Sequence, residues 1–476
     1  MTNLSYNQLK SLVANEVKKF LHSNDFELTL LPASASSRRY FRVTSQSQES
    51  FIATYHEDVR ENIAFVEFTK AFHRCGLPVP WIFHFSPDKK IYFQTDLGDI
   101  TLFNLISTSS LSQEELLNLL KKALDDLFKF QTCLDVPYEF PCSVDRFDEK
   151  SLRWDLNYFK YLFLKIDDII FDELQLEKDF DRWITWFLSL PSNFFMYRDF
   201  QTRNILIHNG KLFYIDYQGG RRGTLLYDLA SFLFDAKANF SVEIREQLLS
   251  YYAQKLHEAG IMTYDDVMKY FPYVALTRLM QAFGAYGYRG LYERKSHFIA
   301  SIPLAARNLA YLLSKISIEK EYPELYNAFM RIIEKHVHET FETNNETLHV
   351  HLFSFSLRKG YPLPHSEHGG GFIFDCRSLP NPGREKQFEP LTGMDTSVIN
   401  YLTQFPEVNE FIQHSFKLIC MTIDNYIQRN FNYLSIGFGC TGGKHRSVFC
   451  TNLMATMLAK KYGSKITLHV EHRELG

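Results

Sequence analysis

The sequence lacks both a long hydrophobic run and a strong charge of either sign. Its 476 residues include 52 Lys and Arg against 55 Asp and Glu, which gives a formal net charge of -3. Proteins that wrap nucleic acid or rest on anionic membranes need a positive surface, so this balance argues against both partners. No stretch approaches the roughly 18 apolar residues of a membrane span. The first 21 residues also lack the apolar core and cleavage site of a signal peptide, so we expect a soluble cytoplasmic protein.

The cysteines and histidines lack the spacings that build cross-links. The seven cysteines form no C-x-x-C pair and no disulfide-framework pattern, which predicts a reducing compartment. Eight of the 17 histidines lie between residues 349 and 472, but no two of these have the i, i+4 spacing of helical metal ligands. We therefore expect no structural metal. The abundant aromatic residues, 43 Phe and 27 Tyr, are interpreted mainly as core packing.

The first part of the chain reads as strands followed by helices. Strand-like runs cover residues 26–43 and 51–58, a helical pattern covers 62–76, and two more strands cover 81–85 and 91–97. Mostly helical patterns then fill 111–191 and 241–335, with short strands between them. This order predicts an α+β fold of two lobes, like that of a protein kinase, with an N-lobe at 1–100 and a helical C-lobe at 101–338.

A second domain is predicted after a polar linker at 339–347. From 348 to 476, strand-like runs alternate with helical ones, which is typical of an α/β domain with a parallel or mixed sheet. A chain of 476 residues has room for these units at roughly 150 residues per domain.

The most informative motif is Y-R-D-F-Q-T-R-N at 197–204, followed by I-D at 215–216. Asp199 precedes Asn204 by five residues, and a strand hairpin leads to Asp216. Phosphoryl transfer needs a carboxylate to accept the proton of the acceptor hydroxyl, and an amide oxygen and a second carboxylate to hold Mg²⁺ against the phosphates. We predict that Asp199 is the catalytic base and that Asn204 and Asp216 are the magnesium ligands.

On these motifs, the first 335 residues resemble the aminoglycoside phosphotransferase and choline kinase superfamily. Within it, they are most similar to bacterial anomeric kinases of N-acetylmuramate and N-acetylglucosamine, which serve cell-wall recycling. The matching segments include S-A-S-S-R-R-Y-F-R-V at 34–43, Q-T-D-L-G-D at 94–99 and R-L-M-Q-A-F-G-A-Y at 278–286. The resemblance implies ATP and Mg²⁺ as cofactors and a small sugar as substrate.

The chain departs from the superfamily at two positions. Tyr197 replaces the histidine two residues before Asp199, and Thr54 stands where most kinases carry a phosphate-binding lysine. We suggest that Arg38 or Arg39 supplies the missing charge. The predicted nucleotide-binding residues are Ser36, Ser37, Arg38, Arg39, Gln94 and Asp96, and the candidate substrate-binding residues are Asp155, Arg278 and Gln281.

The second domain carries G-C-T-G-G-K-H-R-S-V at 439–448, between a strand and a helix. Successive backbone N–H groups at a helix N-terminus, closed by an arginine, form a phosphate cradle. With F-D-C-R-S-L-P-N-P at 374–382, this part resembles the C-terminal domain of the bacterial RNase adapter protein that senses glucosamine-6-phosphate. The resemblance implies an amino-sugar phosphate ligand; the predicted site residues are Asp375, Cys440, Thr441, Gly442, Gly443 and Arg446. The family's histidine after N-P is Gly383, and its basic tail is missing, which argues against RNA binding.

The sequence thus predicts an ATP-dependent amino-sugar kinase with a fused sensor domain. Two alternatives stay open. The kinase lobes could be degenerate and serve a metabolite-sensing adaptor, or Cys440 could be the thiolate nucleophile of an additional phosphatase. Self-association through the second domain also stays open.

Overall fold

The computed structural model describes residues 5–32, 38–46, 49–108, 111–134, 136, 145–337, 347–361 and 371–475. Ser36 and Ser37, and most of the predicted linker, lie outside these ranges. The chain divides into two compact units, Met1–Gly284 with Leu304–Glu334 and Ala285–Pro303 with Lys335–Gly476. Within the described ranges, no helix has the length and hydropathy needed to cross a membrane.

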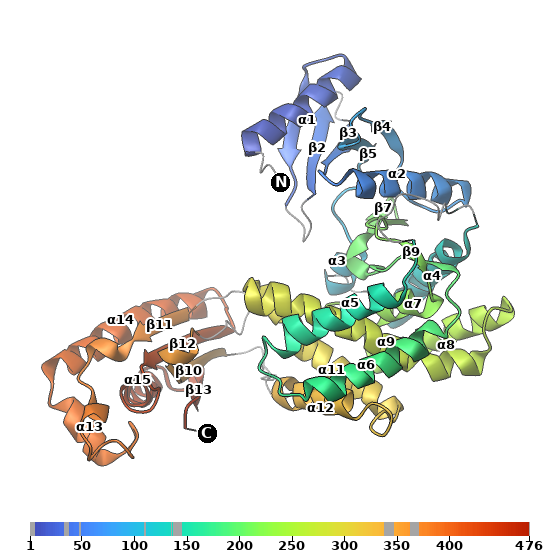
Figure 1. The fold of residues 1–476 in the computed structure, drawn as a ribbon. Coiled ribbons are helices and arrows are strands. Elements are labelled where there is room, and N and C mark those ends of the chain that lie inside the picture. Colours follow the sequence, from blue (N-terminus) through green and yellow to red (C-terminus); the bar gives the residue numbers. More distant parts are fainter. Residues whose placement is uncertain are drawn as a thin grey trace. The chain divides into compact units, whose positions relative to one another are not determined.

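An antiparallel sheet opens the first unit (Figure 1). Its strand order is β1-β2-β3-β5-β4, from β1 (Phe26–Leu30), β2 (Arg39–Ser45), β3 (Ser50–Tyr55), β4 (Ile82–Phe85) and β5 (Ile91–Thr95). Helix α1 (Tyr6–Leu21) begins at a capping box formed by Ser5 and Gln8 and buries Val13 and Val17 against this sheet. Helix α2 (Val59–Arg74) begins at Asp58, whose carboxylate accepts the N–H groups of Arg60 and Glu61.

The helical part of the first unit holds two small two-stranded sheets among its helices. The helices are α3 (Leu102–Thr108), α4 (Gln113–Thr132), α5 (Glu149–Phe159), α6 (Glu173–Leu188), α7 (Leu225–Leu233), α8 (Val242–Glu258), α9 (Tyr264–Tyr286), α10 (Ser296–Ile299), α11 (Ser301–Lys315) and α12 (Pro323–Val337), of which α10 and parts of α9, α11 and α12 are assigned to the second unit. Strand β6 (Phe194–Met196) pairs with β9 (Arg221–Gly223), and β7 (Ile205–His208) pairs with β8 (Lys211–Tyr214). The two-lobed α+β prediction is confirmed.

The last part of the chain is built on a four-stranded parallel sheet. Its order is β11-β12-β10-β13, from β10 (Leu348–Ser356), β11 (Gly371–Asp375), β12 (Tyr433–Cys440) and β13 (Ile466–His472). Alternate residues of β10 and β12, such as Leu352 and Ile436, enter a core shared with α13 (Thr396–Thr403), α14 (Pro406–Gln428) and α15 (Arg446–Tyr462). The predicted α/β class is confirmed, and the three strand pairs of this sheet are parallel.

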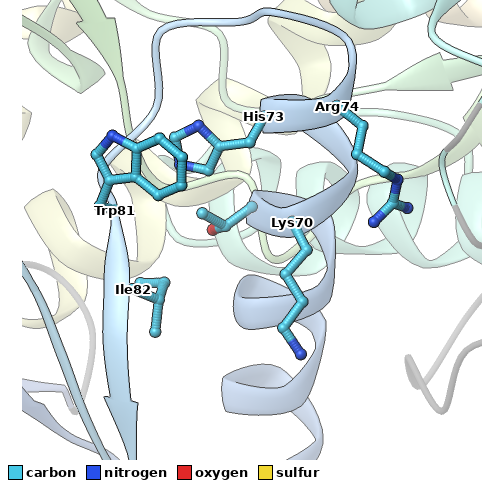
Figure 2. Close-up of a pocket in the computed structure, with 6 residues that line it drawn as sticks. Lys70, His73, Arg74, Trp81 and Ile82 are labelled. Carbon is cyan, nitrogen blue, oxygen red and sulfur yellow. The ribbon is translucent and has the colours of Figure 1, made fainter.

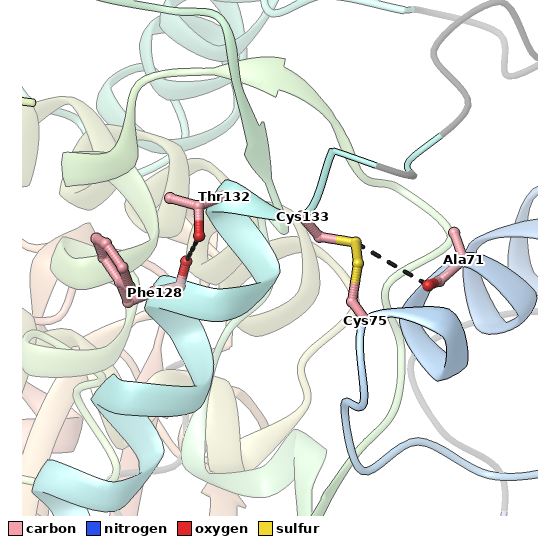
Figure 3. The surroundings of a disulfide bond; sticks show 5 residues. All are labelled: Ala71, Cys75, Phe128, Thr132 and Cys133. Carbon is pink, nitrogen blue, oxygen red and sulfur yellow. Dashed lines mark hydrogen bonds between the residues drawn. A yellow bond between two sulfur atoms is a disulfide. The ribbon is translucent and has the colours of Figure 1, made fainter. Parts of the chain in front are cut away.

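The cysteine spacings gave no indication of a disulfide, but the structure contains one. Cys75, at the end of α2, and Cys133, at the end of α4, form a disulfide with a Cα–Cα distance of 6.1 Å (Figure 3). The two residues are 58 positions apart and meet because two helix ends pack together. No spacing pattern in the sequence therefore predicts this disulfide. The argument from cysteine spacing to a reducing compartment therefore loses its basis.

Candidate functional sites

The turns after β6 and β8 bring the three predicted catalytic residues together. The side-chain amide nitrogen of Asn204 donates to the backbone carbonyl of Asp199 at 2.9 Å and to the Asp216 carboxylate at 3.3 Å. Asn204 ends a 3-10 turn that leads into β7, and Asp216 follows the partner strand β8. The hairpin β7-β8 is therefore the element that places the second carboxylate beside the first.

The backbone around these residues is held in uncommon conformations. Arg198 and Asp216 have φ angles of 75° and 72°, in the left-handed region that non-glycine residues rarely occupy. Asp228, on α7, accepts the backbone N–H groups of Tyr197 and Arg198, both at 2.8 Å. Burial raises the pKa of Asp228 to about 7. This buried carboxyl group fixes the turn immediately before Asp199.

Tyr197 stands where the superfamily has a histidine, and it makes a hydrogen bond of its own. Its ring is buried, and its hydroxyl donates to the carbonyl of Ile215, the residue before Asp216. Burial raises the pKa of Tyr197 well above its usual value, so the hydroxyl keeps its proton. The side chain thus ties the Asp199 turn to the Asp216 turn.

The charge at this site suits a divalent cation. Asp216 has a raised pKa, first because it is desolvated and then because the Asp199 carboxylate repels its charge. A cation between the two carboxylates would relieve that repulsion, and carboxylate and amide oxygens are the ligands that Mg²⁺ prefers. Asp216, Asn204 and the neighbouring Asp199 therefore fit a magnesium ion, which would hold nucleotide phosphates there.

The predicted nucleotide residues fall into two groups. Arg38 is buried, with its guanidinium 2.8 Å from the Glu61 carboxylate and 3.9 Å from that of Asp216. Asp96, in contrast, accepts two hydrogen bonds from Arg42 at 2.7 and 3.0 Å. The structure therefore brings Arg38 to the catalytic residues and places Asp96 in an ion pair of the sheet.

Arg39 and Gln94 both lie in the sheet, Arg39 at the start of β2 next to Arg38 and Gln94 opposite Ile52 of β3. Arg39 donates to the backbone carbonyl of Arg38 at 3.1 Å, and Gln94, on β5, is buried. The sequence did not identify Glu61. Its signal is its position in the first turn after the helix cap Asp58, which becomes informative only once α2 is known to lie beside Arg38.

The three candidate substrate-binding residues also lie in two different places. Arg278, on α9, lies 3.7 Å from the Asp199 carboxylate and donates to the Gln281 side chain at 2.5 Å. Asp155, on α5, is bound by the Arg198 guanidinium at 3.1 and 3.2 Å. Arg278 and Gln281 thus reach the catalytic side, whereas Asp155 supports the residue that precedes Asp199.

The loop of the second domain runs from the end of β12 to the start of α15. The Ser356 hydroxyl donates to the carbonyl of Thr441 at 2.8 Å, and Gly443 has a φ of 73°. A Cβ at Gly443 would lie 2.3 Å from Glu474 Cγ and 3.0 Å from the Ser356 nitrogen, whereas one at Gly442 would meet nothing within 4 Å. The turn therefore requires glycine at one of the two positions.

Arg446 does not close this loop as predicted. One of its terminal nitrogens donates to the carbonyls of Arg377 and Leu379, at 2.9 and 3.0 Å. Its buried Nε has no hydrogen-bond partner among the described residues. The Arg377 guanidinium donates to both carboxylate oxygens of Asp375, which lowers the pKa of Asp375. Arg446 therefore joins the two predicted motifs through backbone carbonyls of the first one.

Cys440 is poorly placed for nucleophilic attack. Its side chain is buried, and its thiol lies 3.1 Å from the Ser447 hydroxyl. The His445 ring lies beside Gly383, about 3.4 Å from where a Cβ would stand, and its Nε2 lies 2.9 Å from the Phe388 carbonyl. An imidazole thus occupies the neighbourhood of the histidine that the sequence lacks at 383.

A separate pocket of about 380 Å³ contains none of the predicted site residues. It lies between α2 and the start of β4, where His73 stacks on Trp81 with ring centroids 3.8 Å apart (Figure 2). Its lining residues are Thr69, Lys70, His73, Arg74, Trp81 and Ile82.

Two family models match the chain. Residues 27–262 match the phosphotransferase enzyme family, and residues 348–476 match the RapZ C-terminal domain. The chain thus contains, in succession, a segment that matches the phosphotransferase enzyme family and a segment that matches the RapZ C-terminal domain. The predicted resemblances to the phosphotransferases and to the C-terminal domain of the RNase adapter are thereby confirmed.

Curated relatives cover only part of the chain. A nucleotide-binding protein of Acidobacterium capsulatum is 35% identical over 137 residues, which are 29% of this chain and 42% of the relative. One of Paraburkholderia phytofirmans is 38% identical over 121 residues, which are 25% of this chain and 38% of the relative. The chain thus spans about two fifths of the length of these relatives.

Among solved structures, an ethanolamine kinase of Plasmodium vivax aligns with a TM-score of 0.48 and 12% identity. It covers 66% of this chain and 91% of its own. The ADP-bound aminoglycoside phosphotransferase APH(2'')-Ib aligns with a TM-score of 0.42 and 15% identity, and covers 64% of this chain and 97% of its own.

Proposed function

We propose that the protein transfers the γ-phosphate of ATP to a hydroxyl group of an amino sugar of the N-acetylmuramate or N-acetylglucosamine type. The observation that carries the proposal is the meeting of Asp199, Asn204 and Asp216 around one turn. Asp199 accepts the proton of the attacking hydroxyl, while Asn204 and Asp216 bind Mg²⁺, which neutralises charge on the phosphates.

The acceptor class is supported from both ends of the chain. The phosphotransferase domain resembles sugar kinases of cell-wall recycling, and the RapZ C-terminal domain resembles a sensor of glucosamine-6-phosphate. Arg278 lies beside Asp199, where a guanidinium can hold a hydroxyl or carboxylate of the acceptor in line with the phosphate. The second domain then binds an amino-sugar phosphate, as product or as regulator.

The test is a substrate panel with the purified full chain. ATP and Mg²⁺ are supplied with N-acetylmuramate, N-acetylglucosamine, glucosamine, choline or an aminoglycoside, and ADP release is measured with product detection. We expect turnover with an amino sugar; choline or an aminoglycoside as the sole substrate would contradict the proposed acceptor.

Asp199→Asn removes the proposed base with little change in shape. We expect kcat to fall by roughly 10²- to 10⁴-fold, the range for loss of general-base catalysis, with an unchanged circular dichroism spectrum. The exposed Asp265 offers a matched control, because Asp265→Asn removes a carboxylate from the start of α9. Equal activities of the two variants would contradict the role of Asp199.

A further inference from the structure

The third strand of the first sheet provides no cation for the nucleotide. Thr54 lies on β3, where it pairs with Tyr40 of β2 on one side and Tyr92 of β5 on the other. Its side chain is fully buried and uncharged. Kinases use a lysine of this strand, paired with a glutamate of the adjacent helix, to hold the phosphates, so this chain must obtain the charge elsewhere.

We propose that Arg38 is the residue that contacts the nucleotide phosphates and that Glu61 is the positioning residue that holds it there. This inference rests on the proposed function, because it assigns a phosphate-binding role at the same site. It adds a specific pair, one member of which no sequence motif indicates.

The geometry of Arg38 matches what a lysine of β3 would provide. Arg38 precedes β2, and its side chain is only 2% exposed. One terminal nitrogen lies 2.8 Å from Glu61, and the other lies 3.9 Å from Asp216. A single cation therefore spans the distance from helix α2 to the proposed magnesium ligand.

Helix α2 determines where Glu61 stands. The carboxylate of Asp58 accepts the N–H groups of Arg60 and Glu61, which fixes the first turn of the helix. His56 also faces Glu61, at 3.7 Å, but burial and the charge of Arg38 lower the pKa of His56. The imidazole is therefore neutral at pH 7, and the charged partner of Glu61 in this group is Arg38.

A guanidinium suits this position better than an ammonium at the same point would. Its planar set of N–H donors can bind a carboxylate through one edge and phosphate oxygens through another.

The experiment compares four variants of the full chain by calorimetric titration with ADP and with ATP in the presence of Mg²⁺. We expect Arg38→Ala to raise the nucleotide Kd at least tenfold and Glu61→Gln to raise it about threefold to tenfold. Arg60→Ala, which removes an exposed arginine next to Glu61, is the control and should change the Kd less than twofold.

The decisive variant combines Arg38→Ala with Thr54→Lys. This double variant returns a cation to β3. We expect its nucleotide affinity to recover at least a third of what Arg38→Ala loses, and a merely structural role of Arg38 would not allow this recovery. If Arg38→Ala does not fold, Arg38→Lys and Glu61→Gln carry the test. The proposal is overturned if Arg38→Ala leaves the Kd within twofold, or if the lysine recovers nothing.

The same titration separates this inference from the proposed function. A wild type that binds ADP but phosphorylates no amino sugar contradicts the acceptor assignment, while the effect of Arg38→Ala on the Kd can still be read. A wild type that binds neither nucleotide contradicts both.

Discussion

Arg38 in the phosphotransferase domain and Arg446 in the RapZ C-terminal domain differ in the charge of the groups around them. Arg38 is within 4 Å of two carboxylates, those of Glu61 and Asp216. Arg446 makes its hydrogen bonds to two uncharged carbonyl groups, and the nearby Asp375 is already bound by Arg377. The first site is rich in acid, so a phosphate bound there would need a cation with it, whereas an anion bound near Arg446 would meet a positive charge that no carboxylate at hydrogen-bond distance offsets among the described residues.

The largest expected effect that separates the two sites is metal removal. EDTA should abolish phosphoryl transfer, because without Mg²⁺ the carboxylates of Asp199 and Asp216 repel nucleotide phosphates. Binding of glucosamine-6-phosphate to the second domain, followed by calorimetry in the same buffer, should change less than twofold. Added MgCl₂ in excess should restore turnover, and turnover that persists in EDTA would break the comparison.

The two domains should also differ in the pH dependence of their stability. Asp228 has a pKa of about 7 in the folded state because it is buried, against about 4 in an unfolded chain. Between these values the folded state keeps a proton that the unfolded state has lost, so the free energy of unfolding falls as pH rises. For wild type we expect a loss of about 2 to 3 kcal/mol between pH 5 and pH 7.5 from this group.

Asp228→Asn cannot ionise and should lack this part of the pH slope. All four tryptophans, at 81, 154, 183 and 186, belong to the phosphotransferase domain, so denaturation followed by tryptophan fluorescence reports on that domain. Asp148→Asn, in the same domain, is the control, because the pKa of Asp148 is lowered and its stabilising effect is lost only at acidic pH. Parallel slopes for wild type and Asp228→Asn would contradict the shifted pKa.

The smallest effect concerns the glycines of the second loop. Gly443→Ala forces a residue with a Cβ into a left-handed conformation and against Glu474, at a cost of about 1 to 2 kcal/mol. We expect it to weaken glucosamine-6-phosphate binding about tenfold. Gly442→Ala, which meets open space, should weaken binding about threefold or less, and the opposite order would show that the loop changes shape on binding.

The sequence predicted features that depend on neighbours along the chain. Asp199, Asn204 and Asp216 lie within 18 residues on one hairpin, so their spacing alone implied that they meet. Glu61 could not be predicted, because its role depends on α2 lying beside Arg38, 23 residues earlier. The Cys75–Cys133 disulfide and the contacts of Arg446 with Arg377 and Leu379 likewise depend on packing between distant segments.

The most direct test of the account is ³¹P NMR of the full chain with ATP, Mg²⁺ and either N-acetylmuramate or N-acetylglucosamine. The account predicts that the γ-phosphate signal of ATP declines while a sugar-phosphate signal and ADP appear, and that Asp199→Asn produces neither. ATP that binds but gives no sugar phosphate with either sugar would contradict the proposed acceptor, and the absence of turnover with every acceptor of the panel would favour a metabolite-sensing adaptor.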